Sequence, residues 1–243
     1  MSDMNGKICL VLGGAKGIGL AIAARLVGDG AIVFITSRNK DDVDMAVSNI
    51  GKNVHGVVLD PSRIDDLESV VSDIQKKHRK IDALILNAGV SEPLALDDFS
   101  LQHFDHHFTT NVRNHVFALK ASLPAMERGG AVVLIGSIAG QAGVPNYSAY
   151  AATKASLRSF ARSWAAELAP QGIRVNVVSP GPTETSMFAS VPEEVKASII
   201  STIPLGRMAH PREVASAAKF LLSNDASFIT GTELCVDGGA KQV

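Results

Sequence analysis

The sequence predicts an α/β protein: a single domain over residues 1–243, built on a doubly wound parallel sheet of about seven strands with helices on both faces. Short apolar, β-branched runs alternate with longer helical patterns along the chain. The apolar runs are continuous, which is typical of parallel strands covered on both faces. The alternation gives right-handed crossover connections, and no repeat or linker-like segment interrupts it.

Each expected element follows from a local pattern. Strands are expected at 7–12, 31–36, 54–59, 82–86, 131–136, 173–178 and 233–237. Helices are expected at 17–29, 41–50, 63–79, 97–105 and 107–127, around 150–154, and near 211–222. Several prolines make 180–210 the least regular segment, so we expect a mobile substrate lid at about 183–210.

Composition and charge exclude several classes of protein. The formal net charge is −1, so we expect no basic surface and no nucleic-acid partner. Cys9 and Cys235 lie in separate apolar stretches without disulfide or metal spacing, which favours a reducing, cytoplasmic compartment. No signal-peptide pattern is present, and no apolar run approaches the roughly 20 residues of a membrane span. We therefore expect no membrane association.

A glycine-rich turn, LGGAKGIG at 12–19, follows the first expected strand and opens the first helix. Gly13, Gly17 and Gly19 permit a tight turn and a close approach of the backbone to a pyrophosphate. The helix N-terminus adds free N–H groups and a positive dipole end. A flexible glycine turn without a ligand is the plainer alternative, but the strand–turn–helix setting favours nucleotide binding.

The end of the second strand, ITSRNK, indicates which dinucleotide binds. An NAD site has a carboxylate about 20 positions beyond the glycine turn, where it binds the ribose 2′-hydroxyl. Here Ser37 and Arg38 stand near that position. Asp41 and Asp42 better fit the first turn of the next helix. Arg38 and Lys16 suit a 2′-phosphate, so we expect NADP(H) rather than NAD(H); two surface cations are the alternative.

Tyr150 and Lys154 are four residues apart in YAATK, so they share a helix face. An ammonium about 4 Å from a phenolate stabilises it by about 4 kcal/mol at an effective dielectric of about 20, or about three pKa units. We therefore expect Lys154 to lower the Tyr150 pKa toward neutral pH, with burial opposing the shift. Ser137 ends an earlier strand and can hydrogen-bond the oxygen that Tyr150 protonates. Alone, the pair also fits an exposed helix surface.

Taken in order, these motifs resemble the short-chain dehydrogenase/reductase (SDR) family. The resemblance runs from the first strand to the C-terminus and rests on GGAKGIG, NAG (87–89), Asn111, Ser137, YAATK, PGPTET (180–185) and VDGG (236–239). It implies a Rossmann-like fold and hydride transfer to or from a nicotinamide cofactor. It also implies that Tyr150 is the general acid/base, that Lys154 binds the nicotinamide ribose, and that Asn111 supports a proton relay through water.

The resemblance further implies a set of binding residues. Asp60 is expected at the adenine, and the NAG segment at the adenosine ribose and the middle of the cofactor. The expected cofactor residues are Gly13, Lys16, Gly17, Ile18, Gly19, Ser37, Arg38, Asp60, Asn87, Ala88, Gly89, Tyr150, Lys154, Pro180, Gly181, Thr183 and Thr185. The expected substrate pocket comprises Ser137, Tyr150, Met187 and Phe188; the last two are expected there from their place in the lid after PGPTET, and a core role is their alternative. Turn chemistry is the alternative role for Asn87 and the prolines.

Two residues depart from the family pattern. Leu12 stands where the family usually has threonine, so a hydroxyl that braces the glycine turn is missing, and we expect packing to hold the turn instead. Pro61 follows Asp60 and has no N–H, so a backbone donor often used for adenine is absent. We expect adenine binding to depend more on Asp60.

Two histidines and two aromatic residues suggest other roles. His103 and His107 have a helical i, i+4 spacing that can bind a metal, but no nearby cysteine or carboxylate cluster completes a site, so we expect no metal. Phe160 and Trp164 lie on an alanine-rich helix that is expected to be buried on two sides. This favours an oligomer interface, and the family commonly forms tetramers; we expect a homotetramer or homodimer.

The leading function is an NADPH-dependent carbonyl reductase or alcohol dehydrogenase acting on a small-molecule carbonyl or alcohol. A more specific alternative is a 3-oxoacyl-(acyl carrier protein) reductase, which docks an acidic carrier on basic surface residues. Arg128 matches one such position, whereas Gln171 stands where a second arginine is expected. A non-catalytic NADP(H)-binding sensor is a third alternative, which the presence of both Tyr150 and Lys154 disfavours.

Overall fold

The computed structural model describes residues 4–189 and 191–241. Its centre is a parallel sheet of seven strands in the order β3-β2-β1-β4-β5-β6-β7. The strands are β1 (Ile8–Leu12), β2 (Ile32–Ser37), β3 (Val54–Val58), β4 (Ile81–Leu86), β5 (Met126–Ile135), β6 (Arg174–Pro180) and β7 (Glu233–Val236). This is the doubly wound, Rossmann-like sheet expected from the sequence. The order reverses between β1 and β4, which opens a crevice at the carboxyl ends of these strands.

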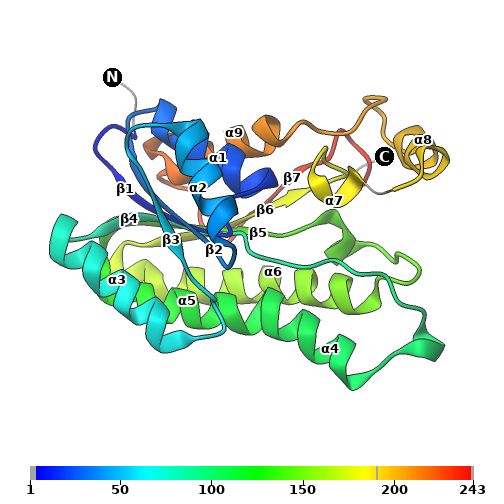
Figure 1. Cartoon of the computed structure of the whole chain (residues 1–243), viewed down its shortest axis with the longest axis horizontal. Helices are drawn as coiled ribbons and strands as arrows, with labels where there is room; N and C mark the ends of the chain where they lie inside the picture. The colour runs from blue at the N-terminus through cyan, green and yellow to red at the C-terminus, as the bar shows by residue number, and fades with distance from the viewer. Residues whose placement is uncertain (1–3, 190, 242–243) are drawn as a thin grey trace.

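Helices cover both faces of the sheet. Figure 1 shows α3, α5 and α6 along one face, with α4 beside them, and α1, α2 and α9 on the other. The helices are α1 (Gly17–Gly28), α2 (Lys40–Ile50), α3 (Ile64–His78), α4 (Leu101–Phe108), α5 (Asn114–Ser122), α6 (Ser148–Leu168), α7 (Ser186–Ala189), α8 (Glu193–Ser201) and α9 (Pro211–Leu222). None of the helices in the described ranges is both long and apolar enough to span a bilayer.

The core forms two layers because successive side chains of a strand point to opposite faces. In β1, Ile8, Leu10 and Leu12 join the buried cluster beneath α3, α5 and α6. Cys9 and Val11 join the cluster that packs against α1 and α9. Both faces of β1 are therefore buried, which explains the continuous apolar run in its sequence.

The structure corrects one stretch of the expected secondary structure. The expected helices 97–105 and 107–127 are instead α4, a π-helical turn at Thr109–Arg113, and α5, which follow one another directly. The helical expectation is wrong after Ser122, because a short 3₁₀ turn contains Pro124 and β5 already begins at Met126. A proline cannot donate the backbone hydrogen bond that would continue the helix.

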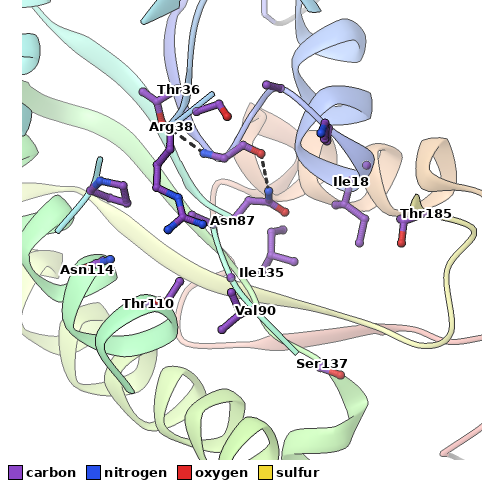
Figure 2. Close-up of a pocket in the computed structure, with 18 of the residues that line it drawn as sticks. Ile18, Thr36, Arg38, Asn87, Val90, Thr110, Asn114, Ile135, Ser137 and Thr185 are labelled. Carbon is purple, nitrogen blue, oxygen red and sulfur yellow. Dashed lines mark hydrogen bonds between the residues drawn. The ribbon is translucent and has the colours of Figure 1, made fainter. Parts of the chain in front are cut away.

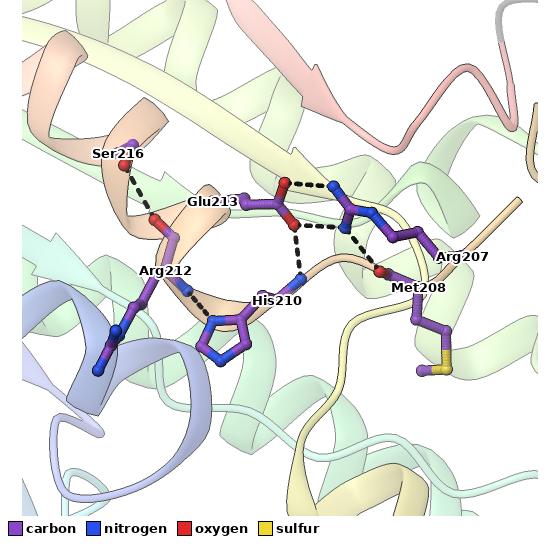
Figure 3. A network of polar contacts seen from close by, with 6 residues as sticks. All are labelled: Arg207, Met208, His210, Arg212, Glu213 and Ser216. Atoms are coloured by element: carbon purple, nitrogen blue, oxygen red, sulfur yellow. Dashed lines mark hydrogen bonds and ion pairs between the residues drawn. The ribbon is translucent and has the colours of Figure 1, made fainter. Parts of the chain in front are cut away.

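The segment expected to form a lid contains α7 and α8 and returns to the core at α9. Figure 3 shows the polar contacts at that return. Arg207 binds both carboxylate oxygens of Glu213, at 2.8 and 2.7 Å, and the His210 backbone N–H donates to Glu213 Oε2 at 2.7 Å. His210 Nδ1 accepts from the Arg212 N–H at 3.1 Å and so caps α9. These contacts fix the end of the segment, because the cap and the bidentate pair share one helix terminus.

Candidate active site

A cleft of about 580 Å³ lies along the carboxyl edge of the sheet. It runs from the glycine turn past Arg38 and Asn87 to Ser137 and Thr185, which come from four different parts of the chain (Figure 2). The cleft contains most of the residues that the sequence predicts for the site: Gly13, Lys16, Gly17, Ile18, Ser37, Arg38, Asp60, Asn87, Ala88, Gly89, Ser137, Tyr150, Lys154, Pro180, Gly181, Thr183, Thr185 and Phe188.

Three predicted residues stand apart from this lining. Gly19 and Asn111 are buried behind the cleft wall and do not line it. The side chain of Met187 lies outside the described part of the structure, so its expected place in the substrate pocket stays a prediction.

Hydrogen bonds brace the glycine turn. The Gly13 N–H donates to Thr36 Oγ1 at 3.3 Å, and the Gly14 N–H donates to the Thr36 carbonyl at 3.1 Å. Asn87 Nδ2 donates to the Gly13 carbonyl oxygen at 2.8 Å, and Figure 2 shows this bond together with the one from Thr36. The Leu12 side chain is packed in the buried core, in agreement with the expected role of packing, and a hydroxyl from elsewhere is added to it. The hydroxyl of Thr36, on the neighbouring strand β2, braces the turn.

The turn also has the features that a pyrophosphate requires. A Cβ atom on Gly19 would lie 2.1 Å from the Gly13 carbonyl oxygen, and one on Gly13 would lie 2.8 Å from Ala88 Cα. Only glycine lets these segments approach so closely. No side chain caps α1, and its first turn contains no acidic residue, so its N–H groups can bind an anion. These residues fit the phosphates of a dinucleotide.

The cationic side of the cleft lies near the ends of β2 and β3. The Arg38 side chain extends into the cleft (Figure 2), and its charge helps to lower the Asp60 pKa, after the larger effect of the Ser62 N–H bond. Asp60 Oδ1 accepts that bond at 2.9 Å, so Ser62 holds the carboxylate beside Pro61. Lys16 pairs with Asp42 at 2.8 Å, so part of its charge is already balanced.

Ser137, Tyr150 and Lys154 meet at the opposite end of the cleft. Ser137 follows β5, and its hydroxyl accepts the Ala139 N–H at 3.2 Å; Ser137 and Tyr150 line the same cleft. Lys154 lies one turn beyond Tyr150 on α6, with Nζ 5.7 Å from the centre of the phenol ring. Its buried ammonium donates to the Ile135 carbonyl at 2.8 Å, which fixes Lys154 against the end of β5.

The pKa values at this end differ from the sequence-based expectation. Burial raises the pKa of Tyr150, and the hydrogen bond from Ser137 opposes that effect. Burial lowers the pKa of Lys154 to about 8. The expectation that Lys154 brings Tyr150 toward neutral pH is not met in this structure, because loss of water around the buried phenolate is the largest influence on its pKa. Tyr150 therefore holds its proton at neutral pH, as a proton donor must.

Asn111 organises the wall behind Lys154. Its Oδ1 accepts the Val90 N–H at 2.8 Å, while Nδ2 donates to the Val90 carbonyl at 2.9 Å and to Thr153 Oγ1 at 3.0 Å. Asn111 lies in the π-helical turn between α4 and α5, a deviation frequent at functional sites. The Asn111 side chain thus ties the segment after β4 to α6, and its part in a proton relay stays a prediction.

His115, which no sequence motif indicates, is fully buried beside this wall. His115 Nε2 lies 2.7 Å from the Ala88 carbonyl oxygen and supports the NAG segment from behind. Burial, with a smaller effect from the Lys154 charge, lowers the His115 pKa to about 3, so the ring is neutral at pH 7. A neutral ring donates to the Ala88 carbonyl through an Nε2–H tautomer. Nothing in the local pattern NHVF distinguishes this histidine from a surface residue.

Comparison with known proteins agrees with this geometry. A family model described as enoyl-(acyl carrier protein) reductase matches residues 13–241. A dehydrogenase/reductase SDR family member 4 from Mus musculus is 37% identical, over 98% of this chain and 88% of its own length. The chain belongs to the short-chain dehydrogenase/reductase family. It is therefore an SDR oxidoreductase, and the resemblance drawn from its motifs is confirmed.

Other SDR relatives cover the whole chain. Oxidoreductase asL5 from Sarocladium schorii is 36% identical over 99% of this chain and 98% of its own length. A 3-oxoacyl-[acyl-carrier-protein] reductase from Salmonella typhimurium is 37% identical over 99% of this chain and 100% of its own. Membership of this family implies a nicotinamide cofactor, and the open helix N-terminus and glycine cradle of this SDR chain fit one.

Proposed function

We propose that this SDR enzyme is an NADPH-dependent reductase that converts a ketone or another carbonyl group into an alcohol, reversibly. One observation carries the proposal. Ser137 and Tyr150 line the same cleft as the glycine turn and Arg38, and Lys154 is buried beside Tyr150. A proton donor, an oxygen-binding hydroxyl and a dinucleotide cradle thus share one space, as carbonyl reduction requires.

The chain's own residues supply the acid–base part of the reaction. The nicotinamide supplies the hydride in reduction, or accepts it in oxidation, when it is bound. Tyr150 donates its phenolic proton to the carbonyl oxygen, and Ser137 donates a hydrogen bond to the same oxygen as negative charge develops there. The Lys154 ammonium stabilises the phenolate that remains. Asn111 supports the return of a proton through water.

The pH dependence of reduction should report Lys154. Its pKa is lowered to about 8, so its ammonium is charged below that pH and neutral above it. The Tyr150 pKa is raised, so the phenol keeps its proton across the same range. We therefore expect kcat/KM for carbonyl reduction to be level near neutral pH and to fall above about pH 8. Steady-state rates at constant ionic strength check this, and a profile that stays level to about pH 10 contradicts it.

The cofactor is proposed to be NADP(H) rather than NAD(H). Ser37 and Arg38 stand at the end of β2, and no carboxylate side chain from that strand end lines the cleft. Arg38 is the main candidate for a 2′-phosphate, because Lys16 already pairs with Asp42.

A second candidate function is reduction of a 3-oxoacyl group carried by acyl carrier protein. The relatives that bear this activity in their names favour it, because they align over the full chain. The basic surface residue gives weaker support. Arg128 lies at the start of β5 and donates to the Pro170 carbonyl at 3.1 Å, close to Gln171. Ser137 follows the other end of β5, and Arg128 does not line the cleft of its own chain.

One experiment separates the two candidates. NADPH oxidation is followed with a carrier-linked 3-oxoacyl thioester, the same acyl group on a short thiol, and simple ketones. A carrier-specific reductase should show a much higher kcat/KM for the carrier-linked thioester than for the short thioester. Equal values for the two thioesters would exclude the carrier-specific candidate and retain the general carbonyl reductase. Absence of turnover with every compound would contradict both.

Four further features belong to the proposal. We propose that the chain forms one domain over residues 1–243, and that 183–210 acts as a lid whose Phe188 borders the substrate.

We also propose a homotetramer or homodimer, since Phe160 stacks on Trp164 at 5.0 Å on α6 and Phe228 is fully exposed. A cytoplasmic location is proposed because both Cys9 and Cys235 are free thiols. Light scattering measures the molar mass in solution, and a monomer at micromolar concentration would exclude both the homotetramer and the homodimer.

A further inference from the structure

A cluster of imidazole and carboxylate groups lies where the segment after β4 meets α4. One donor atom from each of Glu92, His103 and His107 can be chosen so that all three lie within 4.8 Å of one another. His106 joins them, with Nε2 at 3.7 Å from Glu92 Oε1. His103 and His107 are one helical turn apart on α4, whereas Glu92 belongs to the separate segment after β4. The cluster therefore exists only in the folded chain.

His107 is held in the tautomer that a metal requires. Its Nδ1 lies 3.0 Å from the His103 carbonyl oxygen, and its Nε2 accepts the Glu92 backbone N–H at 3.2 Å. The proton is therefore on Nδ1, and the lone pair is on Nε2. Metal-binding histidines commonly donate their other ring N–H to a carbonyl in this way.

The other donors are available to a ligand. Within the described ranges the ring nitrogens of His103 make no hydrogen bond; the ring only contacts Phe99 and His107, with centroids at 5.3 and 4.3 Å. The exposed carboxylate of Glu92 has His106 as its one ion-pair partner among the described residues. A metal would replace the Glu92 N–H at His107 Nε2, and that N–H would turn to water because Glu92 is exposed.

We propose that Glu92, His103 and His107 bind a divalent transition-metal ion, and that Zn²⁺ fits this set best. Imidazole nitrogens with one carboxylate suit Zn²⁺, whereas Ca²⁺ and Mg²⁺ prefer oxygen ligands. Donors at about 2.0–2.1 Å from a tetrahedral ion lie about 3.4 Å apart, so side-chain rotations must draw the groups together. The donor atoms already lie within 4.8 Å of one another, so closure needs only these rotations and the local turn of the Glu92 N–H.

The spacing of the histidines did not indicate a metal site, because no carboxylate cluster lies near them in the sequence. The fold brings the Glu92 carboxylate to them from the segment after β4. This segment is also the one that Asn111 holds through both polar groups of Val90, and Val90 and His106 both line the cleft. A bound ion would therefore fasten the segment to α4 beside the catalytic wall, as a structural clamp on the rim of the active site.

Metal binding is tested on the full chain without an affinity tag, stripped with a chelator and desalted. Zn²⁺ is titrated by calorimetry, bound metal is measured after gel filtration, and Co²⁺ serves as a visible-absorption probe of coordination. We expect one ion per chain, a higher Tm with Zn²⁺, and a Co²⁺ spectrum typical of nitrogen and oxygen ligands in a tetrahedral site. Failure to retain the ion, or a Co²⁺ spectrum equal to that of the aqueous ion, overturns the proposal.

Two pairs of variants locate the site. Glu92→Gln and His103→Gln remove exposed or half-buried donors and should each weaken Zn²⁺ binding at least tenfold, with loss of the Tm increase. Glu68→Gln and His55→Gln make the same chemical changes outside the cluster and should bind Zn²⁺ as the native chain does. Unchanged binding in the first pair, or equal loss in the second, contradicts the assignment. Tm measured in the presence of chelator shows that each variant folds.

Discussion

Replacing Tyr150 with Phe is expected to lower kcat/KM for carbonyl reduction by about 10²–10⁴-fold, the usual contribution of a positioned acid or base. Phenylalanine keeps the ring but removes the only group that the proposal assigns to protonate the carbonyl oxygen. NADPH affinity should change little, because the glycine turn and Arg38 supply the phosphate contacts and remain intact. Steady-state kinetics and fluorescence titration of NADPH measure the two effects separately.

Tyr147 provides the matched control. It is the one other tyrosine of the chain, and its ring centroid lies 6.3 Å from that of Tyr150. Tyr147→Phe removes the same hydroxyl next to the same helix and should keep kcat/KM within a few fold of the native value. Near-native turnover by Tyr150→Phe would remove Tyr150 from the acid–base role, whatever the control shows.

Replacing Arg38 with Asp is expected to weaken NADPH binding by about 10–150-fold and to reverse the preference between NADPH and NADH. The size follows from losing hydrogen bonds to a charged group, worth about 1.5–3 kcal/mol. The new carboxylate would repel a 2′-phosphate and accept a hydrogen bond from a ribose 2′-hydroxyl, as acidic residues do in NAD sites. The ratio of kcat/KM for the two cofactors measures the change.

Lys16 and Arg162 serve as comparisons for Arg38. Lys16→Ala should have a smaller effect, because Lys16 shares its charge with Asp42 at 2.8 Å. Arg162→Asp makes the same charge change on the exposed side of α6, outside the cleft, and should leave the cofactor ratio unchanged. A native enzyme with the higher kcat/KM for NADH, or an Arg38→Asp variant that still prefers NADPH, would refute the assignment of the 2′-phosphate site.

The sequence predicted the parts of the site that depend on local order along the chain. Gly13 and Gly17 follow a strand and open a helix, so the parallel sheet alone brings them to the carboxyl edge. Tyr150 and Lys154 share a helix face by spacing alone. Each of these two short segments contains both the functional residues and the spacing that positions them. The structure brings the two segments together in one cleft.

Features that depend on packing between segments distant in the chain could not be predicted from local sequence patterns. Thr36 replaces the hydroxyl missing at Leu12, and this follows only from how β2 and β1 lie side by side. The burial that raises the Tyr150 pKa depends on the walls around the phenol, which helix spacing does not reveal. The early start of β5 at Met126 comes from pairing with Ile81, a contact with no local signal.

The central claim is that this SDR enzyme reduces a carbonyl with NADPH, with Tyr150 supplying the proton. The most direct measurement uses NADPH carrying deuterium at the transferable C4 position, with the panel of ketones and 3-oxoacyl thioesters, and detects deuterium in the products by mass spectrometry. We expect an alcohol with one deuterium on the former carbonyl carbon, formed at a rate about 10²–10⁴-fold lower with Tyr150→Phe. NADPH that binds tightly but transfers deuterium to no carbonyl in the panel would exclude carbonyl reduction by this enzyme.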